Sequence, residues 1–512
     1  MLFETQLSNQ PYDMAITDLR NTRTWQELNS RVLKIAGYFR YVQKLQANDH
    51  VALVVGNRIE FMEAMFGGIV AGLWVTPVNT HLLPAEVQYI VEDSTAKCVL
   101  VDREHASLVC ANDKSSGLPS FTLDNIESLF ESLTEADISR CESYRPSPND
   151  VAGGTMLYTS GTTGRPKGVK RAKPATLGEA ISKMKSGGKL FGLSGTGPHL
   201  VTGPLYHAAP MLFALYDMLN GAPVVIMPKW DISVFLETVA GYRIVTTHLV
   251  PTMFVRLLNY RDALGDGAVL PKLSSLGLVL HGAAPIAVST KQKMIEWWGP
   301  ILVEYWGGSE AGTTTLVTSE EWMKFPGTVG KPLDHFQVYV GDAQGNPVDE
   351  SVGALYCRHA FLEQVFSYHN DVEKTAKAHP QPYVFSIGDI GSVDEQGFVY
   401  LSDRESNMII SGGVNIYPAE VEQALIEHPD VADVAVFGIP NEEWGEEVRA
   451  VVQLKDGRDA SELLARNIRE FVQTKVAKFK VPRSVSFENS LPRTPTGKLL
   501  VRVLKEKYKN NS

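Results

Sequence analysis

The chain has 512 residues, of which 44% are hydrophobic and 21% charged, a balance typical of a soluble globular protein with large cores. Its 58 acidic and 48 basic residues give a formal net charge of −10, which argues against a nucleic-acid-binding protein. Four widely spaced cysteines, Cys98, Cys110, Cys141 and Cys357, argue against a zinc site and a disulfide framework and favour a reducing compartment.

The N-terminal segment lacks a basic stretch followed by an apolar core, so no secretory signal is predicted. The most apolar early segment, residues 66–78, is too short to span a bilayer. We therefore expect a cytoplasmic protein without an integral membrane segment, and peripheral contact with a membrane stays open.

Short runs rich in valine, isoleucine and leucine alternate with helix-patterned stretches along the N-terminal part of the chain. Continuous apolar runs of this kind are typical of parallel strands that are buried on both faces. The intervening stretches IEFMEAMFGGIVAGLW and VSTKQKMIEWWG are predicted to be helices. The sequence therefore predicts an α/β fold, in which a large N-terminal body contains stacked α/β sheets. The runs are HVALVVG, KCVLVD, APVVIM, RIVTTHLV, SLGLVLHG and PILVEYWG.

The pattern changes at two places. Residues 110–150, rich in Ser, Asp and Glu, are expected to form a surface connection. Near residue 400 a strand, a Gly-Gly turn, a helix beginning at Pro418 and the strand VADVAVFG are predicted, followed by a helix over LLARNIREFVQTKVAKFKVP. We expect a large domain over residues 1–402, a hinge over 403–406 and a small α+β domain over 407–512.

The loop YTSGTTGRPKG, residues 158–168, combines glycines, hydroxyl residues and a Pro-Lys pair directly after an apolar run. Glycines let the backbone approach a ligand closely, and successive N–H groups in such a turn bind anions. The loop is therefore interpreted as a polyphosphate site. It is not a P-loop, because Pro166 stands where the second glycine is required and Gly168 follows Lys167. The dinucleotide-binding pattern G-x-G-x-x-G is not met either.

The string TSGTTGRPKG resembles the phosphate loop of the adenylate-forming ANL superfamily, which comprises acyl-CoA synthetases, peptide-synthetase adenylation domains and beetle luciferases. Other segments resemble the remaining motifs of this superfamily in the same order, so that the resemblance covers nearly the whole chain. Fatty-acid and acyl-CoA synthetases are the members that it resembles most. The segments are HGAAP (281–285), EYWGGSEAG (304–312), FSIGDIG (385–391), LSDRESNMIISGGVNIYPAEVE (401–422) and LPRTPTGK (491–498).

The resemblance implies a two-step reaction. A carboxylate attacks the α-phosphate of ATP to give an acyl-adenylate and pyrophosphate, and a thiol, usually that of coenzyme A, then takes the acyl group. Thr162 and Glu310 are the implied Mg²⁺ contacts, and Mg²⁺ together with lysines would neutralise the repelling anions. Lys498 would act in adenylation, after which the mobile small domain would rotate and present its Gly-Gly turn to the thiol.

The resemblance also implies the site residues, group by group. The catalytic set is Lys498, Glu310, Thr162 and Lys167. The ATP site comprises Thr159, Ser160, Gly161, Thr162, Thr163, Gly164, Lys167, Gly282, Ala283, Ala284, Tyr305, Trp306, Gly307, Ser309, Asp389, Arg404 and Lys498, with Asp389 on the ribose hydroxyls. The acid site comprises His207, Met211, Val250, Gly282, Gly307 and Gly308, and the coenzyme A site comprises Ser411, Gly412 and Gly413.

Four positions depart from the pattern of the family. Ser406 and Asn407 replace charged residues that are common at the hinge, which puts the rate of rotation in question. Ile387 replaces a common threonine before the Gly-Asp pair, and Ser309 replaces a threonine beside the magnesium glutamate. None of these changes removes a catalytic group, so an active enzyme is expected.

The segments expected to build the acid pocket are apolar and aromatic and contain no aspartate: PLYHAAPM, HLVPTMF, HGAAP and EYWGGS. An α-amino acid is disfavoured, because its ammonium group would need a carboxylate partner once desolvated. A fatty or other lipophilic acid is favoured, with His207 either near the acid or structural. An aryl or steroid side-chain acid, a carrier-protein acceptor, a lactone product and a silent nucleotide-binding paralogue stay open, as does a homodimer.

Overall fold

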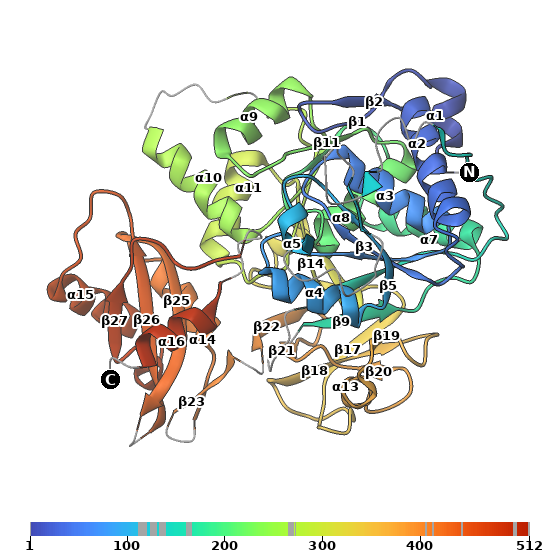
Figure 1. Cartoon of the computed structure of the whole chain (residues 1–512). Coiled ribbons are helices and arrows are strands. Elements are labelled where there is room, and N and C mark those ends of the chain that lie inside the picture. The colour runs from blue at the N-terminus through green and yellow to red at the C-terminus, as the bar shows by residue number, and fades with distance from the viewer. Residues whose placement is uncertain are drawn as a thin grey trace.

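The computed structural model describes residues 2–110, 120–122, 131–132, 140–159, 166–264, 271, 273–404, 407–411, 414–441, 444–494 and 499–509. These residues form four β-sheets with associated helices, and the C-terminal sheet stands beside a larger body (Figure 1). In the described ranges, no helix combines the length and the apolar character needed to cross a membrane.

The largest sheet of the body has nine strands. Its inner strands pair in parallel, and antiparallel pairs occur only toward its two ends. In spatial order the strands are β16 (Lys331–Pro332), β15 (Gly312–Thr318), β14 (Leu302–Gly308), β13 (Leu278–His281), β12 (Thr246–Leu249), β10 (His199–Val201), β11 (Val224–Ile226), β1 (Met14–Thr17) and β2 (Thr22–Thr24).

The second sheet has eight strands, most of which are parallel. Two of them, β6 and β7, come from the region expected to be a surface connection, so that expectation is wrong for these strands. They are too short for an apolar period to reveal them. The spatial order is β19 (Phe366–Tyr368), β9 (Lys167–Arg171), β8 (Gly154–Thr159), β4 (Trp74–Pro77), β3 (His50–Val54), β5 (Ala96–Val101), β6 (Ser120–Thr122) and β7 (Glu131–Ser132).

The central strands of these sheets are buried on both faces, as their continuous apolar runs predicted. In β3, Val51 and Leu53 belong to one hydrophobic core, whereas Ala52 and Val54 belong to another. Because successive side chains of a strand point to opposite faces, an all-apolar strand needs a covering layer on each side. Helices provide these layers.

One layer of helices lies between the two large sheets, since its side chains share a single core with strands of both. It contains α2 (Trp25–Gly37), α3 (Ile59–Val70), α7 (Leu177–Leu190) and α8 (Ala208–Asn220), with α1 (Glu4–Asn9) and the π-helical turn Tyr38–Val42 at its margin. The outer face of the nine-stranded sheet is covered by α9 (Ile232–Gly241), α10 (Pro251–Leu264) and α11 (Val288–Trp298), and that of the eight-stranded sheet by α4 (Pro84–Asp93) and α5 (Ala106–Cys110).

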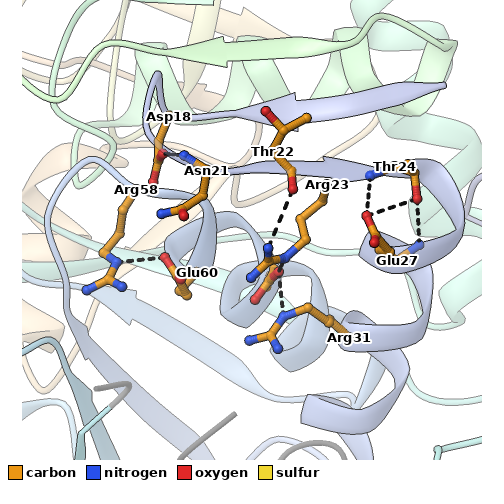
Figure 2. Close-up of polar contacts among 10 residues, drawn as sticks. Asp18, Asn21, Thr22, Arg23, Thr24, Glu27, Arg31, Arg58 and Glu60 are labelled. Atoms are coloured by element: carbon orange, nitrogen blue, oxygen red, sulfur yellow. Dashed lines mark hydrogen bonds and ion pairs between the residues drawn. The ribbon is translucent and has the colours of Figure 1, made fainter. Parts of the chain in front are cut away.

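The start of this inner layer is fixed by polar contacts. Thr24 caps α2: its hydroxyl accepts a hydrogen bond from the Glu27 amide (3.2 Å), and the Glu27 carboxylate accepts one from the Thr24 amide (2.8 Å) (Figure 2). On α3, the fully buried Glu63 carboxylate pairs with Nε of Arg31 at 2.6 Å and with Nε of Arg23 at 3.5 Å. A buried carboxylate needs such partners, so these ion pairs hold α2 and the β1–β2 hairpin against α3.

A third, antiparallel sheet completes the body. Its core contains Phe385, Leu355 and Trp306, the last contributed by β14 of the nine-stranded sheet. The strands are β17 (Phe336–Val340), β18 (Gly353–His359), β21 (Asp389–Val393) and β22 (Val399–Arg404), with β20 (Val384–Phe385) paired to β18. The helices α12 (Ser319–Trp322) and α13 (Val372–Ala378) lie in the same part of the chain.

The C-terminal sheet has helices on both faces: α14 and α15 share one core with it and α16 another. The predicted helix over residues 463–482 is too long, because α15 ends at Gln473, where the Thr474 hydroxyl donates to the Phe471 carbonyl (2.7 Å). The elements are β24 (Val414–Ile416), β23 (Ile409–Ser411), β26 (Gly445–Leu454), β25 (Val431–Asn441), β27 (Ser484–Phe487), α14 (Pro418–Ile426), α15 (Glu462–Gln473), the 3₁₀ turn Lys478–Lys480 and α16 (Val501–Lys509).

The C-terminal sheet meets the body where β22 adjoins α14. The Asp403 carboxylate accepts hydrogen bonds from the Ala419 amide (3.1 Å) and from the Asn407 side chain (3.1 Å). Glu422, one turn further along α14, accepts a hydrogen bond from the Val436 amide (2.8 Å). Burial raises the pKa of Glu422 to about 7, with Asp403 adding to the shift.

We expect Glu422 to make stability depend on pH. The folded-state pKa of Glu422 lies above its ordinary value, so the protonated side chain stabilises the fold relative to the ionised one. This stabilisation is fully present below the pKa of the unfolded state and is lost as the pH rises through about 7. Glu422→Gln should therefore flatten the fall in unfolding free energy between about pH 5 and about pH 7.5, measured by urea denaturation followed in the C-terminal sheet. The exposed Glu470→Gln on α15 is the control, and identical pH profiles for wild type and Glu422→Gln would contradict the assignment.

Candidate active site

A cavity of about 1180 Å³ is lined by residues of all three sheets of the body. Its floor lies where β12, β13 and β14 reach their carboxyl ends, the edge at which open parallel sheets bind ligands. Most described residues that the sequence assigned to the catalytic, ATP and acid sites meet here. They are Thr159, His207, Val250, Ala283, Ala284, Tyr305, Gly307, Gly308, Ser309, Glu310 and Asp389.

The turn after β13 approaches β14 very closely. A Cβ at Gly282 would lie 2.6 Å from the Tyr305 carbonyl oxygen, so only glycine fits there. The next residue, Ala283, has a positive φ of 65°, which is uncommon for a residue with a side chain. This strained turn brings Ala283 and Ala284 to the cavity wall beside Tyr305.

The end of β14 is tied to the third sheet. The Trp306 indole Nε1–H donates to Oδ2 of Asp389 at 2.7 Å, and both residues are buried. Asp389 is the first residue of β21 and pairs with the backbone of Arg404 in β22. The hydrogen bond therefore holds the Asp389 carboxylate at the cavity, whereas the Trp306 ring packs in the core of the third sheet and is not among the cavity-lining residues.

Glu310 follows the end of β14 and lies near several residues that the sequence reasoning did not identify. The Tyr368 hydroxyl donates to Oε1 of Glu310 at 3.2 Å, and Nζ of Lys374 lies 4.0 Å from the Tyr368 ring centroid. Lys167 pairs with Asp371 at 3.3 Å, and Asp371 also caps α13 through the Lys374 amide (3.0 Å). The contacts of the capped helix and of Lys167 lower the pKa of Asp371.

The wall opposite is aromatic and neutral. His207 is the N-cap residue of α8, and farther in, Nε2 of His248 and the Tyr305 hydroxyl are 3.0 Å apart. Burial lowers the pKa of His248 to about 3, so this histidine is uncharged at neutral pH. Phe213 packs edge-on against Tyr305, with ring centroids 5.4 Å apart. Met211 lies elsewhere, fully buried in the core of the inner helix layer.

A buried ion pair supports β14 from behind. Nζ of Lys291, on α11, lies 2.6 Å from Oε2 of Glu304, and His281 lies 3.9 Å from the same oxygen. Burial lowers the pKa of Lys291 and raises that of Glu304. Glu304 precedes Tyr305 in the strand, and neighbouring side chains in a strand point to opposite faces. The pair therefore anchors the strand that carries Tyr305 and Trp306.

Part of the site expected from the sequence falls outside the described residues: Ser160, Gly161, Thr162, Thr163, Gly164, Gly412, Gly413, Lys498 and the side chain of Arg404. Ser411 lies in β23 of the C-terminal sheet and is not among the cavity-lining residues. Lys167 is not among the cavity-lining residues either; it pairs in the sheet with Thr159, which is, and its side chain is held by Asp371.

The chain belongs to the AMP-binding enzymes. It matches the family model of the AMP-binding enzyme over residues 3–367 and that of the AMP-binding enzyme C-terminal domain over residues 420–498. The expected membership of the adenylate-forming ANL superfamily is thus confirmed, and with it the use of ATP as the nucleotide.

Relatives of known name cover nearly the full length of the chain. It is 30% identical to the long-chain-fatty-acid–CoA ligase FadD13 of Mycobacterium tuberculosis, over 98% of this chain and 95% of that protein. It is 31% identical to a methyl-dioxo-octahydroindenyl-propanoyl:CoA ligase of Rhodococcus jostii, over 97% of this chain and 96% of that protein.

Solved structures share the fold over the same extent. An o-succinylbenzoate CoA synthetase from Bacillus subtilis, in complex with its acyl-adenylate intermediate, has a TM-score of 0.79 and 25% identity, covering 98% of this chain and 97% of that one. ATP-bound MatB from Rhodopseudomonas palustris has a TM-score of 0.83 and 25% identity, covering 100% and 99%. The expected α/β body with a smaller C-terminal domain is confirmed.

We expect Trp306→Phe to weaken ATP binding. The variant keeps an aromatic ring but removes the donor that orients Asp389. Losing a hydrogen bond to a charged group removes about 1.5 kcal/mol, or roughly tenfold in affinity. Calorimetry with ATP measures this, and Trp297→Phe, on α11 against the outer core of the nine-stranded sheet, is the control. Unchanged affinity would mean that Asp389 does not act on the nucleotide.

Proposed function

We propose that the protein is an AMP-forming acid–thiol ligase that converts a carboxylic acid and ATP into an acyl-adenylate and then into an acyl-CoA thioester. The observation that carries this proposal is the cavity in which Glu310, Asp389 and His207 face one space. A nucleotide-binding side and an apolar side thus adjoin, as the joining of an acid to AMP requires. The two relatives named above, which cover nearly the whole chain, are CoA ligases.

Asp389, held in place by Trp306, belongs to the nucleotide side of the proposed site. The indole orients the carboxylate, which then accepts from the ribose hydroxyls, and Ala283 and Ala284 flank the adenine. Lys167 and the glycine-rich loop would neutralise the phosphates, for which a point cation and backbone N–H groups are suited.

Glu310 has the chemistry that a magnesium site needs. Glu310 lines the cavity, and the Tyr368 hydroxyl orients its carboxylate. Mg²⁺ is usually held by one or two carboxylates together with substrate phosphates. Glu310 and Thr162 would hold the ion, which when bound neutralises charge on the phosphates.

The acid side of the proposed site runs along α8 and the wall built by His248, Tyr305 and Phe213. Because this wall is apolar and neutral, a fatty or other lipophilic acid fits it. Relatives of similar identity are named for chemically different acids, so the class of acid must be found from the pocket itself.

The second step would use the C-terminal sheet. We place the hinge at residues 403–406, between a domain of residues 1–402 and one of residues 407–512. Rotation there would withdraw Lys498 after adenylation and bring Ser411, Gly412 and Gly413 to the thiol of coenzyme A. Removing a charged group after the first step leaves room for the second nucleophile.

The test is AMP release from ATP over a panel of acids, each with and without coenzyme A. The panel contains straight-chain, benzoate-type, cinnamate-type and steroid side-chain acids. AMP release that depends on both an acid and coenzyme A supports the ligase. AMP release that does not depend on coenzyme A points instead to another acceptor. If no acid leads to AMP release, the proposal is contradicted.

We expect Lys498→Ala to separate the two half-reactions. Adenylation should slow by about 100-fold or more, because a cation aimed at the developing charge is lost, whereas thioester formation from supplied acyl-adenylate should change little. Single-turnover assays of each half measure this. Lys455→Ala, an exposed lysine just beyond β26, is the control, and equal loss in both halves would refute the division of labour.

A further inference from the structure

The acid side of the cavity contains a charged residue that the function described so far does not use. Arg171 is the last residue of β9 and lines the cavity. Its Nε–H donates to the Ser309 carbonyl at 2.8 Å, and a terminal nitrogen lies 3.5 Å from the Gly308 carbonyl. Among the described residues, no carboxylate forms an ion pair with Arg171.

Tyr216, on α8, lies on the same stretch of the cavity wall and interacts electrostatically with Arg171. No described residue forms a hydrogen bond with its hydroxyl group. Its ring is held by α7, where a Cβ on Gly188 would lie 2.9 Å from the Tyr216 Cβ, so glycine permits the close packing. A guanidinium group and a phenol are thus fixed together at the cavity wall.

This placement is unfavourable for the protein alone. Burial lowers the pKa of Arg171, while Tyr216 and, to a smaller extent, Glu310 oppose the shift. Nearby wall residues such as Met184, Leu212 and Phe213 offer no charge to pair with it. A partly buried charge that meets backbone carbonyls but no described carboxylate at ion-pair distance is costly, and a planar guanidinium fork matches a carboxylate or a carbonyl oxygen.

Tyr216 and Arg171 reach the cavity from elements other than those that carry Asp389, although Arg171 also bonds to Ser309, a residue that the sequence assigned to the ATP site. Tyr216 lies on the helix that begins beside His207, whereas the nucleotide side is formed by the turn after β13 and by Asp389. Lys173 and Lys183 also line the cavity; Lys173 is bonded to the Asn48 side chain, and Lys183 is exposed to solvent.

We propose that the acid activated by this enzyme carries a second oxygen group, a carboxylate or a ketone, on an otherwise apolar skeleton, and that Arg171 and Tyr216 bind it. This inference rests on the proposed function and narrows it from a lipophilic acid to one with a distal oxygen. Arg171 supplies charge and two donors in one plane, and Tyr216 adds a hydroxyl donor.

Matched acids test this inference. Straight-chain monoacids of several lengths are each compared with the α,ω-diacid and the keto acid of the same carbon number. Wild type should favour an oxygenated acid by about 10- to 100-fold in kcat/KM, the range expected for hydrogen bonds to a charged group. The diacid and keto arms distinguish the two kinds of oxygen.

Arg171→Met should abolish this preference by lowering kcat/KM for the oxygenated acid, with little change for the monoacid. Tyr216→Phe should reduce it by a smaller factor, and Arg171→Lys should retain part of it for the diacid. Arg256→Met, an exposed arginine on α10, is the control. Melting temperatures confirm that each variant is folded.

Three outcomes overturn the inference while leaving the ligase intact: no preference in wild type, equal loss for both acids in Arg171→Met, or a raised KM for ATP alone. Equal loss for both acids would mean that Arg171 supports the β14–β15 turn. A raised KM for ATP alone would mean that Arg171 contacts a phosphate. If no acid gives AMP, the proposed function fails, and calorimetric binding of each acid pair to wild type and Arg171→Met still decides the role of Arg171.

Discussion

The hydrogen bond between the Trp306 indole and the Asp389 carboxylate joins two sheets at the point where the cavity forms. There β14 of the nine-stranded sheet meets β21 of the third sheet, so the bond sets the distance between the aromatic ring and the carboxylate. Buried polar groups almost always have a partner, and here each group is the partner of the other. The nucleotide side is therefore arranged before any ligand binds, which lowers the entropy that binding must overcome.

Charge is distributed unevenly around this bond. Behind β14, Lys291 and Glu304 neutralise each other in a fully buried pair, and His248 is uncharged because burial disfavours its cation. On the phosphate side, Glu310 and Lys167 are partly exposed, and each contacts a polar group of the protein. A carboxylate substrate and a polyphosphate would thus be drawn to one side of the cavity, while an apolar chain meets the neutral wall.

The sequence predicted those parts of the fold that local pattern determines. The apolar runs became β3, β5 and β11–β14, and the motifs led to Glu310, Asp389 and the turn at Ala283. The pattern failed for β6 and β7, which are too short, and for the end of α15, where a threonine bonds to the backbone instead. Tyr368 and Asp371 were missed because only tertiary pairing of β19 with β9 brings them to the site. Arg171 was missed as well, because nothing local in the sequence indicates which way a lone arginine points.

The contact between Lys167 and Asp371 has a consequence for how anions enter the site. Asp371 already serves the amide of Lys374 at the start of α13, so it remains satisfied when Lys167 moves away. A phosphate that binds Lys167 would therefore exchange one ion pair for another instead of creating a new one. Such an exchange releases few bound counterions. The affinity for the phosphate would therefore fall less steeply with ionic strength than the number of nearby cations suggests.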